Sequence, residues 1–222
     1  MSDAGTPEQE DPFAAERRRM VDEQIRARGV RDPAVLAAME RVRRECFVPE
    51  ALRGRAFADG PLPIGEQQTI SQPYVVAAMV ELLQLEPEDR VLEIGSGSGY
   101  ALAVLARIAA EAYGVERFAS LARLARERLA EQGIANARVR HGDGTQGWPE
   151  HAPYQGILVS AAAAEIPPAL LDQLTLGGRL VMPVGSSPGV QTLTRVTREG
   201  ARDYRHERLD GVVFVPLVPS KG

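Results

Sequence analysis

The sequence predicts a doubly wound α/β fold built around a mostly parallel sheet. From Arg90 onwards, short apolar strands alternate with helical segments, and only short connections join them. The first of these strands runs directly into a turn rich in glycine, which is typical of the ligand-binding edge of such sheets. The chain has 222 residues, of which 44% are hydrophobic, and this suffices for one α/β domain with a small addition.

The predicted elements follow one another as a polar tail, a helical cap, a core and a last pair of strands. Residues 1–10 are small and polar and are predicted to be disordered. Asp11 and Asp32, each followed by proline, mark the starts of two helices, 11–29 and 35–42. A connector rich in proline and glycine is expected at 59–65, and the apolar spacing predicts a helix over 73–83. The core is then expected to contain strand 90–95, helix 100–110, strand 112–116, helix 121–132, strands 137–141 and 156–161, helix 168–174 and strand 179–184. The end of the chain predicts two antiparallel strands, 192–198 and 204–217.

Composition excludes several classes of partner. The net charge of −4 argues against a surface for nucleic acid or for an anionic membrane. A single cysteine, Cys46, favours a reducing compartment, and the polar first dozen residues lack the apolar stretch of a secretory signal. We therefore expect a cytoplasmic protein. The three histidines are far apart in the sequence and show no metal-ligand spacing, so no metal is expected.

The glycine turn predicts the class of cofactor. Gly95, Gly97 and Gly99 let the backbone approach a ligand closely, and the following helix start offers free N–H groups. A dinucleotide fingerprint would need glycine at Tyr100, so a nicotinamide dehydrogenase is the least favoured alternative. An acidic strand residue followed by G-x-G-x-G instead resembles motif I of the Rossmann-like class I S-adenosylmethionine-dependent methyltransferases. The expected contacts of S-adenosylmethionine here are Glu93, Gly95, Ser96, Gly97, Ser98 and Gly99. A tight turn without any ligand is the alternative.

Two further acidic residues stand at the ends of neighbouring strands. Glu116 follows the glycine turn by about 20 residues, where a carboxylate commonly accepts ribose hydroxyls. The alternative is a surface ion pair with Arg117 or Arg123. Asp143, with Gly144 behind it, is predicted to face the adenine edge; the alternative is an Asp-Gly turn without a ligand.

The segment before the core contains Ser71, which local physics alone predicts to be the N-cap of the helix at Pro73. A series of motifs gives a second interpretation. They occur in the order PLPIG, QTISQPY, VLEIGSGSGY, GVER, HGDG, GWPEHAPY, AEIPPALLDQL, GGRLVMPVG and FVPLV. Together they resemble the protein-L-isoaspartate O-methyltransferases over about residues 14–218, and TISQPY is not a general methyltransferase motif.

The resemblance implies an activity and a site. Members of that family transfer a methyl group to the α-carboxylate of L-isoaspartyl residues in damaged proteins, which are the expected partners. By resemblance Ser71 is the catalytic residue, orienting the carboxylate by a hydrogen bond. The segment over the cofactor and the carboxylate would be Gln68, Thr69, Ile70 and Ser71. The residues flanking the substrate would be Leu62, Pro63, Ile64 and Gly65 on one side and Val215, Pro216 and Leu217 on the other. The chain would then form one domain, 11–222. Its parts would be a helical cap and substrate segment (11–72), a cofactor-binding core (73–185) and C-terminal strands (186–222). The protein is expected to be a monomer.

Four positions depart from the family pattern. Gln155 replaces a usual Asp and is expected to weaken a loop hydrogen bond, and Ala164 replaces a usual Pro and is expected to loosen a turn. Arg43 stands at a usual Pro position and Gln67 at a frequent Gly. These departures keep two alternatives open. One is a methyltransferase for a dedicated peptide or metabolite carboxylate, and the other is a non-catalytic paralogue that binds cofactor or a partner protein.

Overall fold

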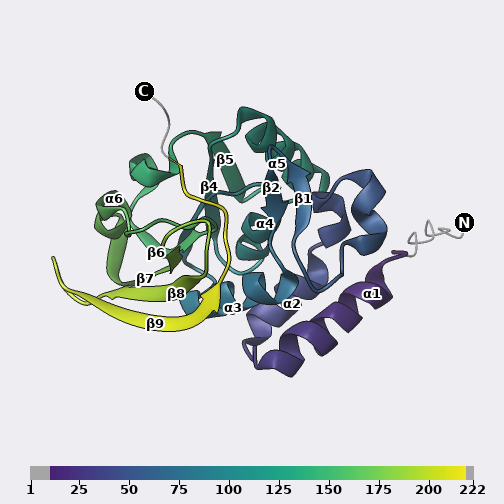
Figure 1. Cartoon of the computed structure of the whole chain (residues 1–222), viewed down its shortest axis with the longest axis horizontal. Helices are drawn as coiled ribbons and strands as arrows, with labels where there is room; N and C mark the ends of the chain where they lie inside the picture. Colours follow the sequence, from purple (N-terminus) through teal and green to yellow (C-terminus); the bar gives the residue numbers. More distant parts are fainter. Residues whose placement is uncertain (1–10, 219–222) are drawn as a thin grey trace, which may run out of the picture.

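A seven-stranded sheet forms the centre of the protein in a computed structural model that describes residues 11–218 (Figure 1). The strands are β3 (Arg90–Ile94), β4 (Glu111–Glu116), β5 (Ala137–His141), β6 (Tyr154–Val159), β7 (Leu174–Val184), β8 (Gln191–Arg198) and β9 (Tyr204–Val212). Their order is β5-β4-β3-β6-β7-β8-β9. Neighbours from β5 to β7 are parallel, whereas β8 and β9 are antiparallel additions. The predicted doubly wound, mostly parallel sheet is confirmed.

Helices cover both faces of this sheet because its strands are apolar on both sides. Val91 packs with one buried cluster, while its neighbour Leu92 packs with the other, as strand alternation requires. The first cluster joins the sheet to α2 (Pro33–Arg41), α3 (Pro73–Leu83), α4 (Tyr100–Ala106) and α5 (Ala119–Glu131). The second lies beneath α6 (Pro168–Asp172) and includes the buried rings of Tyr113 and Tyr154.

The amino-terminal segment forms the predicted helical cap, on the side of the molecule opposite β9 (Figure 1). It contains α1 (Ala14–Arg19), a π-helical turn (Met20–Ile25), 3₁₀ turns (Arg26–Arg28, Arg44–Phe47 and Glu50–Arg55) and α2 (Pro33–Arg41). The predicted cap at Asp32 is confirmed, because its carboxylate accepts from the N–H groups of Ala34 and Val35. The first helix begins later than predicted: Phe13 is its N-cap residue, and Asp11 accepts a hydrogen bond from the Phe13 N–H.

A small hairpin that the sequence analysis did not predict begins within the connector 59–65. Strand β1 (Leu62–Gly65) pairs antiparallel with β2 (Gln68–Ile70). The two residues between them, Glu66 and Gln67, have positive φ of 50° and 57°. Neither residue type signals such a turn, which is why the hairpin was missed.

Several other boundaries differ from the prediction, most clearly the ends of α4, α6 and β9. Helix α4 ends at Ala106, and α6 ends at Asp172, so Leu174 begins strand β7 instead of ending a helix. Strand β9 ends at Val212. The chain then returns to the middle of the sheet, where Pro216 forms a parallel bridge with Ala162 (Figure 1). The predicted tail, 1–10, lies outside the described residues. Within residues 11–218, no helix combines the length and the apolar character needed to cross a bilayer.

Candidate active site

The candidate site lies where the sheet topology reverses. Strand β3 has β4 on one side and β6 on the other, because the chain returns past β3 after β5. Ligands of doubly wound folds bind at such a switch point, beyond the carboxyl ends of the strands. Here the Ser160 N–H donates to the Ile94 carbonyl at 2.8 Å, which holds the ends of β6 and β3 together.

The glycine turn at the end of β3 has the predicted conformation. Gly99 has φ of 89°, and a Cβ there would lie 3.1 Å from the Ala125 Cβ of α5, so glycine permits both the turn and the close helix contact. The N–H groups of the three glycines are already bonded within the protein, so the free N–H groups expected at the start of the following helix stay a prediction. The Gly95 N–H donates to the Val115 carbonyl, the Gly97 N–H to Glu116 and the Gly99 N–H to the Ser96 carbonyl.

Glu116 is buried at the end of β4 and helps to hold the glycine turn. One carboxylate oxygen accepts from the Gly97 N–H at 2.7 Å, and the other from the Phe118 N–H at 2.9 Å. The alternative of a surface ion pair is wrong, because Arg123 pairs with Glu127 and the Arg117 guanidinium lies over the Phe118 ring. Each carboxylate oxygen can accept a second hydrogen bond, so capacity for ribose hydroxyls remains.

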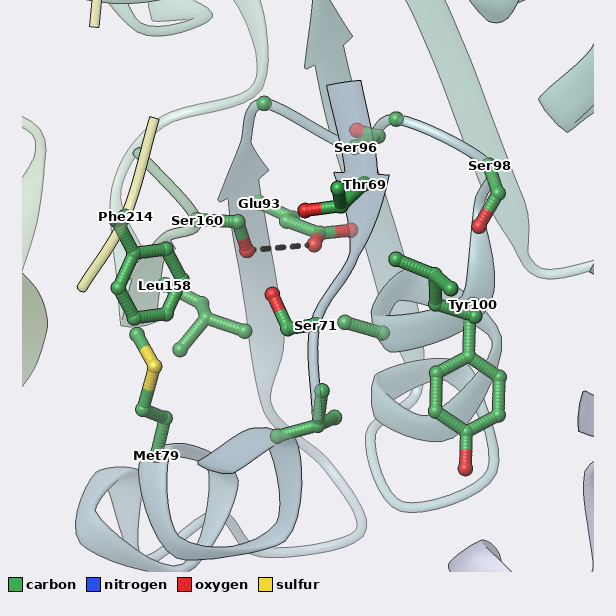
Figure 2. A pocket seen from close by; sticks show the side chains of 15 residues that line it. Thr69, Ser71, Met79, Glu93, Ser96, Ser98, Tyr100, Leu158, Ser160 and Phe214 are labelled. Carbon is green, nitrogen blue, oxygen red and sulfur yellow. Dashed lines mark hydrogen bonds between the residues drawn. The ribbon is translucent and has the colours of Figure 1, made fainter. Parts of the chain in front are cut away.

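Glu93 is buried in the wall of a small cavity beside the turn (Figure 2). Its Oε1 accepts from the Ser160 hydroxyl at 2.9 Å. Its Oε2 is one of the buried oxygens that have no hydrogen-bond partner within residues 11–218, as is the Ser96 hydroxyl. Burial raises the pKa of Glu93 to about 8, and the nearby charge of Glu116 acts in the same direction. A cationic or donor group in this cavity would satisfy the unpaired carboxylate oxygen.

Ser71 faces this cavity from the opposite side. Figure 2 shows the hydroxyls of Ser71 and Ser160 and the Glu93 carboxylate turned toward one space, with Thr69 above them. The prediction that Ser71 caps a helix is wrong: the N-cap residue of α3 is Gln72, and no side chain caps that helix end. The Ser71 hydroxyl is therefore not used in a helix cap. Ser71 lies between Ile70, the last residue of β2, and Gln72, the N-cap residue of α3.

Two more hollows adjoin this cavity. The first is lined by residues that include Gln68, Glu116, Phe118, Gly144, Ala161 and 215–218. The second is a groove of about 660 Å³ that passes Ser71 and is lined mainly by 187–190 and 211–216. Its volume falls in the range of small-molecule sites. The three hollows share Thr69 and Ser160 in their walls, so they lie next to one another around the switch point.

The remaining predicted residues divide into two groups. Val215, Pro216 and Leu217 line the hollow beside Glu116, as does Gly144. The Asp143 carboxylate instead caps a 3₁₀ turn, accepting from the N–H and the hydroxyl of Thr145, and is absent from the cavity walls. On β1, Leu62 and Ile64 are buried in the core and only Pro63 and Gly65 face outward. The adenine contact of Asp143 and the substrate contacts of β1 stay predictions.

Several lining residues were not predicted. Phe214 and Leu158 form an apolar wall, and Phe118 follows Glu116 directly. Ser160 had a signal in the sequence, since it directly follows β6 at the switch point and stands among small residues. No pattern in the sequence indicated Phe214, because it reaches the cavity only where the chain turns back toward the sheet after β9.

Comparison with known proteins identifies the family. The sequence model described as Protein-L-isoaspartate(D-aspartate) O-methyltransferase matches residues 15–222. The chain belongs to this family. It is 57% identical over 210 residues to protein-L-isoaspartate O-methyltransferase 1 of Rhodopseudomonas palustris strain HaA2, covering 95% of this chain and 86% of that relative. It is 59% identical to protein-L-isoaspartate O-methyltransferase 2 of Pelobacter propionicus, covering 91% of this chain and 90% of the relative.

Solved structures agree with the family assignment. A candidate protein-L-isoaspartate O-methyltransferase of Plasmodium falciparum, solved in complex with S-adenosyl-L-homocysteine, superposes with a TM-score of 0.79 at 26% identity. The match covers 91% of this chain and 98% of that one. Of the departures from the family pattern, Gln155 keeps a hydrogen bond: its side-chain oxygen accepts from the Arg90 N–H at 2.8 Å, at the start of β3. The expected weakening of this bond relative to an Asp stays a prediction.

Proposed function

We propose that this protein transfers the methyl group of S-adenosylmethionine to the free α-carboxylate of L-isoaspartyl residues in damaged proteins. The observation that carries the proposal is the group of adjoining hollows at the switch point. It has the glycine turn, Glu93 and Glu116 on one side, and Ser71 with an open groove on the other. Such a two-sided space suits a small cofactor that meets a peptide.

The residues present fit S-adenosylmethionine, which supplies an electrophilic methyl group on a sulfonium. The unpartnered buried oxygen of Glu93 suits the ammonium of the methionine portion, which would also stabilise the ionised carboxylate. The remaining acceptor capacity of Glu116 suits the ribose hydroxyls. The contacts proposed for Gln68, Thr69 and Ile70 rest on the hairpin lying over the turn, where a Gly97 Cβ would meet the Ile64 side chain.

The chemistry asks little of the protein beyond alignment. The acceptor carboxylate is ionised near neutral pH, so no general base has to remove a proton. The Ser71 hydroxyl would donate a hydrogen bond to one carboxylate oxygen and leave the other directed at the methyl group. Phe214 and Leu158 would exclude water around the reacting atoms. Pro216 and its neighbours would contact the peptide backbone, so that many sequences are accepted.

A pair of matched peptides tests the proposal. The protein is expected to methylate an isoaspartyl peptide and to leave the aspartyl peptide of the same sequence unmodified. Equal transfer to both peptides, or transfer to neither, would reject the function. Activity restricted to one dedicated peptide would favour the alternative of a specialised methyltransferase. Binding of S-adenosylhomocysteine without any transfer would indicate a non-catalytic paralogue.

The role of Ser71 is tested by Ser71→Ala. Loss of a hydrogen bond made to a charged group is expected to lower kcat/KM by about tenfold to a hundredfold. The dissociation constant for S-adenosylhomocysteine should change little, as calorimetric titration would measure. Ser120→Ala is the matched control, since Ser120 is exposed and its hydroxyl donates to Glu66 outside the cavities. Full activity of the Ser71 variant would show that the hydroxyl has no part in the reaction.

The setting of this activity is also a proposal. The single cysteine supports the cytoplasm as the compartment, and the net charge of −4 supports protein substrates in preference to nucleic acid. We propose a monomer, because the cavities that would hold cofactor and acceptor are formed within one chain.

A further inference from the structure

Arg44 is a fully buried cation in the helical cap, next to the candidate site. Its exposed fraction is 0%, and burial lowers its pKa. Its Nε donates to the Ala56 carbonyl at 2.7 Å, and its Nη2 donates to the Ser71 carbonyl at 2.8 Å. The guanidinium also lies over the ring of Tyr100, 4.6 Å from the ring centroid. Tyr100 is the first residue of α4, directly behind the glycine turn.

This arginine has no carboxylate partner among residues 11–218. The other buried arginine of the cap, Arg17, is bound by Asp11 and Glu45, which balance its charge. A buried guanidinium held only by carbonyl dipoles and a ring face costs stability through lost hydration. One of its nitrogens, Nη1, is also without a hydrogen-bond partner. An apolar side chain of similar size could fill this place without the loss of hydration that a buried guanidinium suffers. Packing alone therefore does not explain why an arginine stands at position 44.

The contact with Ser71 provides that explanation. The bond from Arg44 is the one hydrogen bond that the described residues make to Ser71, whose hydroxyl is left to the cavity. Ser71 stands between the end of β2 and the N-cap residue Gln72, where neither the strand ladder nor the helix holds its carbonyl. The same guanidinium touches the start of α4. Arg44 thus fixes the Ser71 backbone relative to the helix that follows the glycine turn.

We propose that Arg44 is a positioning residue for methyl transfer, holding the Ser71 backbone so that its hydroxyl meets the acceptor carboxylate. The proposal rests on the function proposed above. It predicts that Arg44 acts on the reaction through Ser71, and that its loss affects turnover more than cofactor binding.

Arg44→Lys is the test variant, because it keeps the charge and most of the volume but cannot reach two carbonyls in the same fork geometry. A small displacement of a reacting group can lower kcat by about a hundredfold. We expect kcat for an isoaspartyl peptide to fall by about tenfold to a hundredfold, with the S-adenosylhomocysteine dissociation constant within about threefold of the parent value. Arg17→Lys is the matched control: it perturbs a buried arginine of the same cap that does not contact Ser71.

A double-mutant cycle distinguishes positioning from general damage. In the Ser71→Ala background, Arg44→Lys is expected to lower the residual turnover by less than about twofold, because the hydroxyl it positions is gone. Equal losses in both backgrounds, or no loss in the parent, would overturn the proposal. If Ser71→Ala alone keeps full activity, the proposed role of Ser71 fails, and that outcome is read from the single variant. Should Arg44→Lys not fold, as judged by thermal unfolding, the neutral Arg44→Gln enters the same cycle with the same expectations.

Discussion

Glu93 shows how one buried carboxylate links the site to pH. Its pKa is raised to about 8 because burial penalises the charged form, whereas the same group in the unfolded chain titrates near its ordinary value. Between those two pH values the folded protein retains a proton that the unfolded chain has released. The contribution of this group to stability is therefore fully present below the ordinary pKa and is lost as the pH rises through about 8.

Glu93→Gln tests this linkage, since glutamine cannot ionise. The unfolding free energy of the parent is expected to fall relative to that of the variant between about pH 5 and pH 8.5, as urea denaturation at each pH would measure. Glu111→Gln is a control of opposite sign, because its hydrogen bond to Arg90 lowers the pKa of Glu111. That variant should be less stable than the parent above about pH 4.5, and the difference should shrink as the pH falls below that value. Parallel pH profiles of the parent and Glu93→Gln would contradict the assignment.

At the scale of single elements, the sequence predicted those whose signals are local. Strand β5 and helix α3 have the predicted bounds, since apolar spacing and flanking turn residues specify them. The β1–β2 hairpin was missed because its turn, Glu66-Gln67, lacks the Asn-Gly or Asp-Gly that usually marks two residues at positive φ. The end of β9 was missed because the apolar run continues past Val212 while the chain leaves the sheet. Tertiary bonds to Ala162 decide that departure, and no local pattern records them.

The hairpin turn gives a stability prediction. Gln67 is exposed and has φ of 57°, a conformation that costs a residue with a Cβ about 1 kcal/mol and costs glycine much less. Gln67→Gly is therefore expected to raise the unfolding free energy by up to about 1 kcal/mol, measured by urea denaturation. Gln84→Gly, at φ of 49° after α3, should shift it in the same direction. Gln132→Gly is the opposing control, because φ there is −87° and glycine only adds unfolded-state entropy. Destabilisation by Gln67→Gly would show that the turn is not strained.

At the scale of the whole molecule, the candidate site combines parts that the sequence keeps far apart. The glycine turn and Glu116 could be predicted because strand, turn and acidic residue have fixed spacing in this fold. Ser71 came only from a resemblance, since local physics predicted a helix cap that the structure does not contain. Phe214 and the support of Ser71 by Arg44 could not be predicted, because both depend on how the two ends of the chain pack against the core.

The carboxyl-terminal segment, 213–218, forms part of the wall of the hollow beside Glu116. The way in which it is bonded to the sheet leads to a prediction about its local opening. Residues 213–218 are held by backbone bonds at Ala162, which donates to the Val215 carbonyl and accepts from the Leu217 N–H. They are also held by two side-chain bonds at Phe214, whose N–H donates to Gln191 and whose carbonyl accepts from Ser187. Most of the segment is at least partly exposed, with Phe214 as its buried anchor. Such a segment is expected to open locally at a lower free energy than the core strands.

If the cofactor occupies the hollow that this segment lines, opening must release the ligand first. At an S-adenosylhomocysteine concentration of about 100 times the dissociation constant, exchange of the hydrogen-bonded amides of Phe214 and Leu217 should therefore slow by about a hundredfold. Amides of β9, an edge strand that lines none of the hollow around Glu116, should exchange at an unchanged rate through openings that leave the ligand bound. Hydrogen exchange followed by mass spectrometry measures both segments in one experiment. If both segments are protected equally, or if the carboxyl-terminal segment is not protected at all, this segment does not cover the bound cofactor and the prediction is wrong.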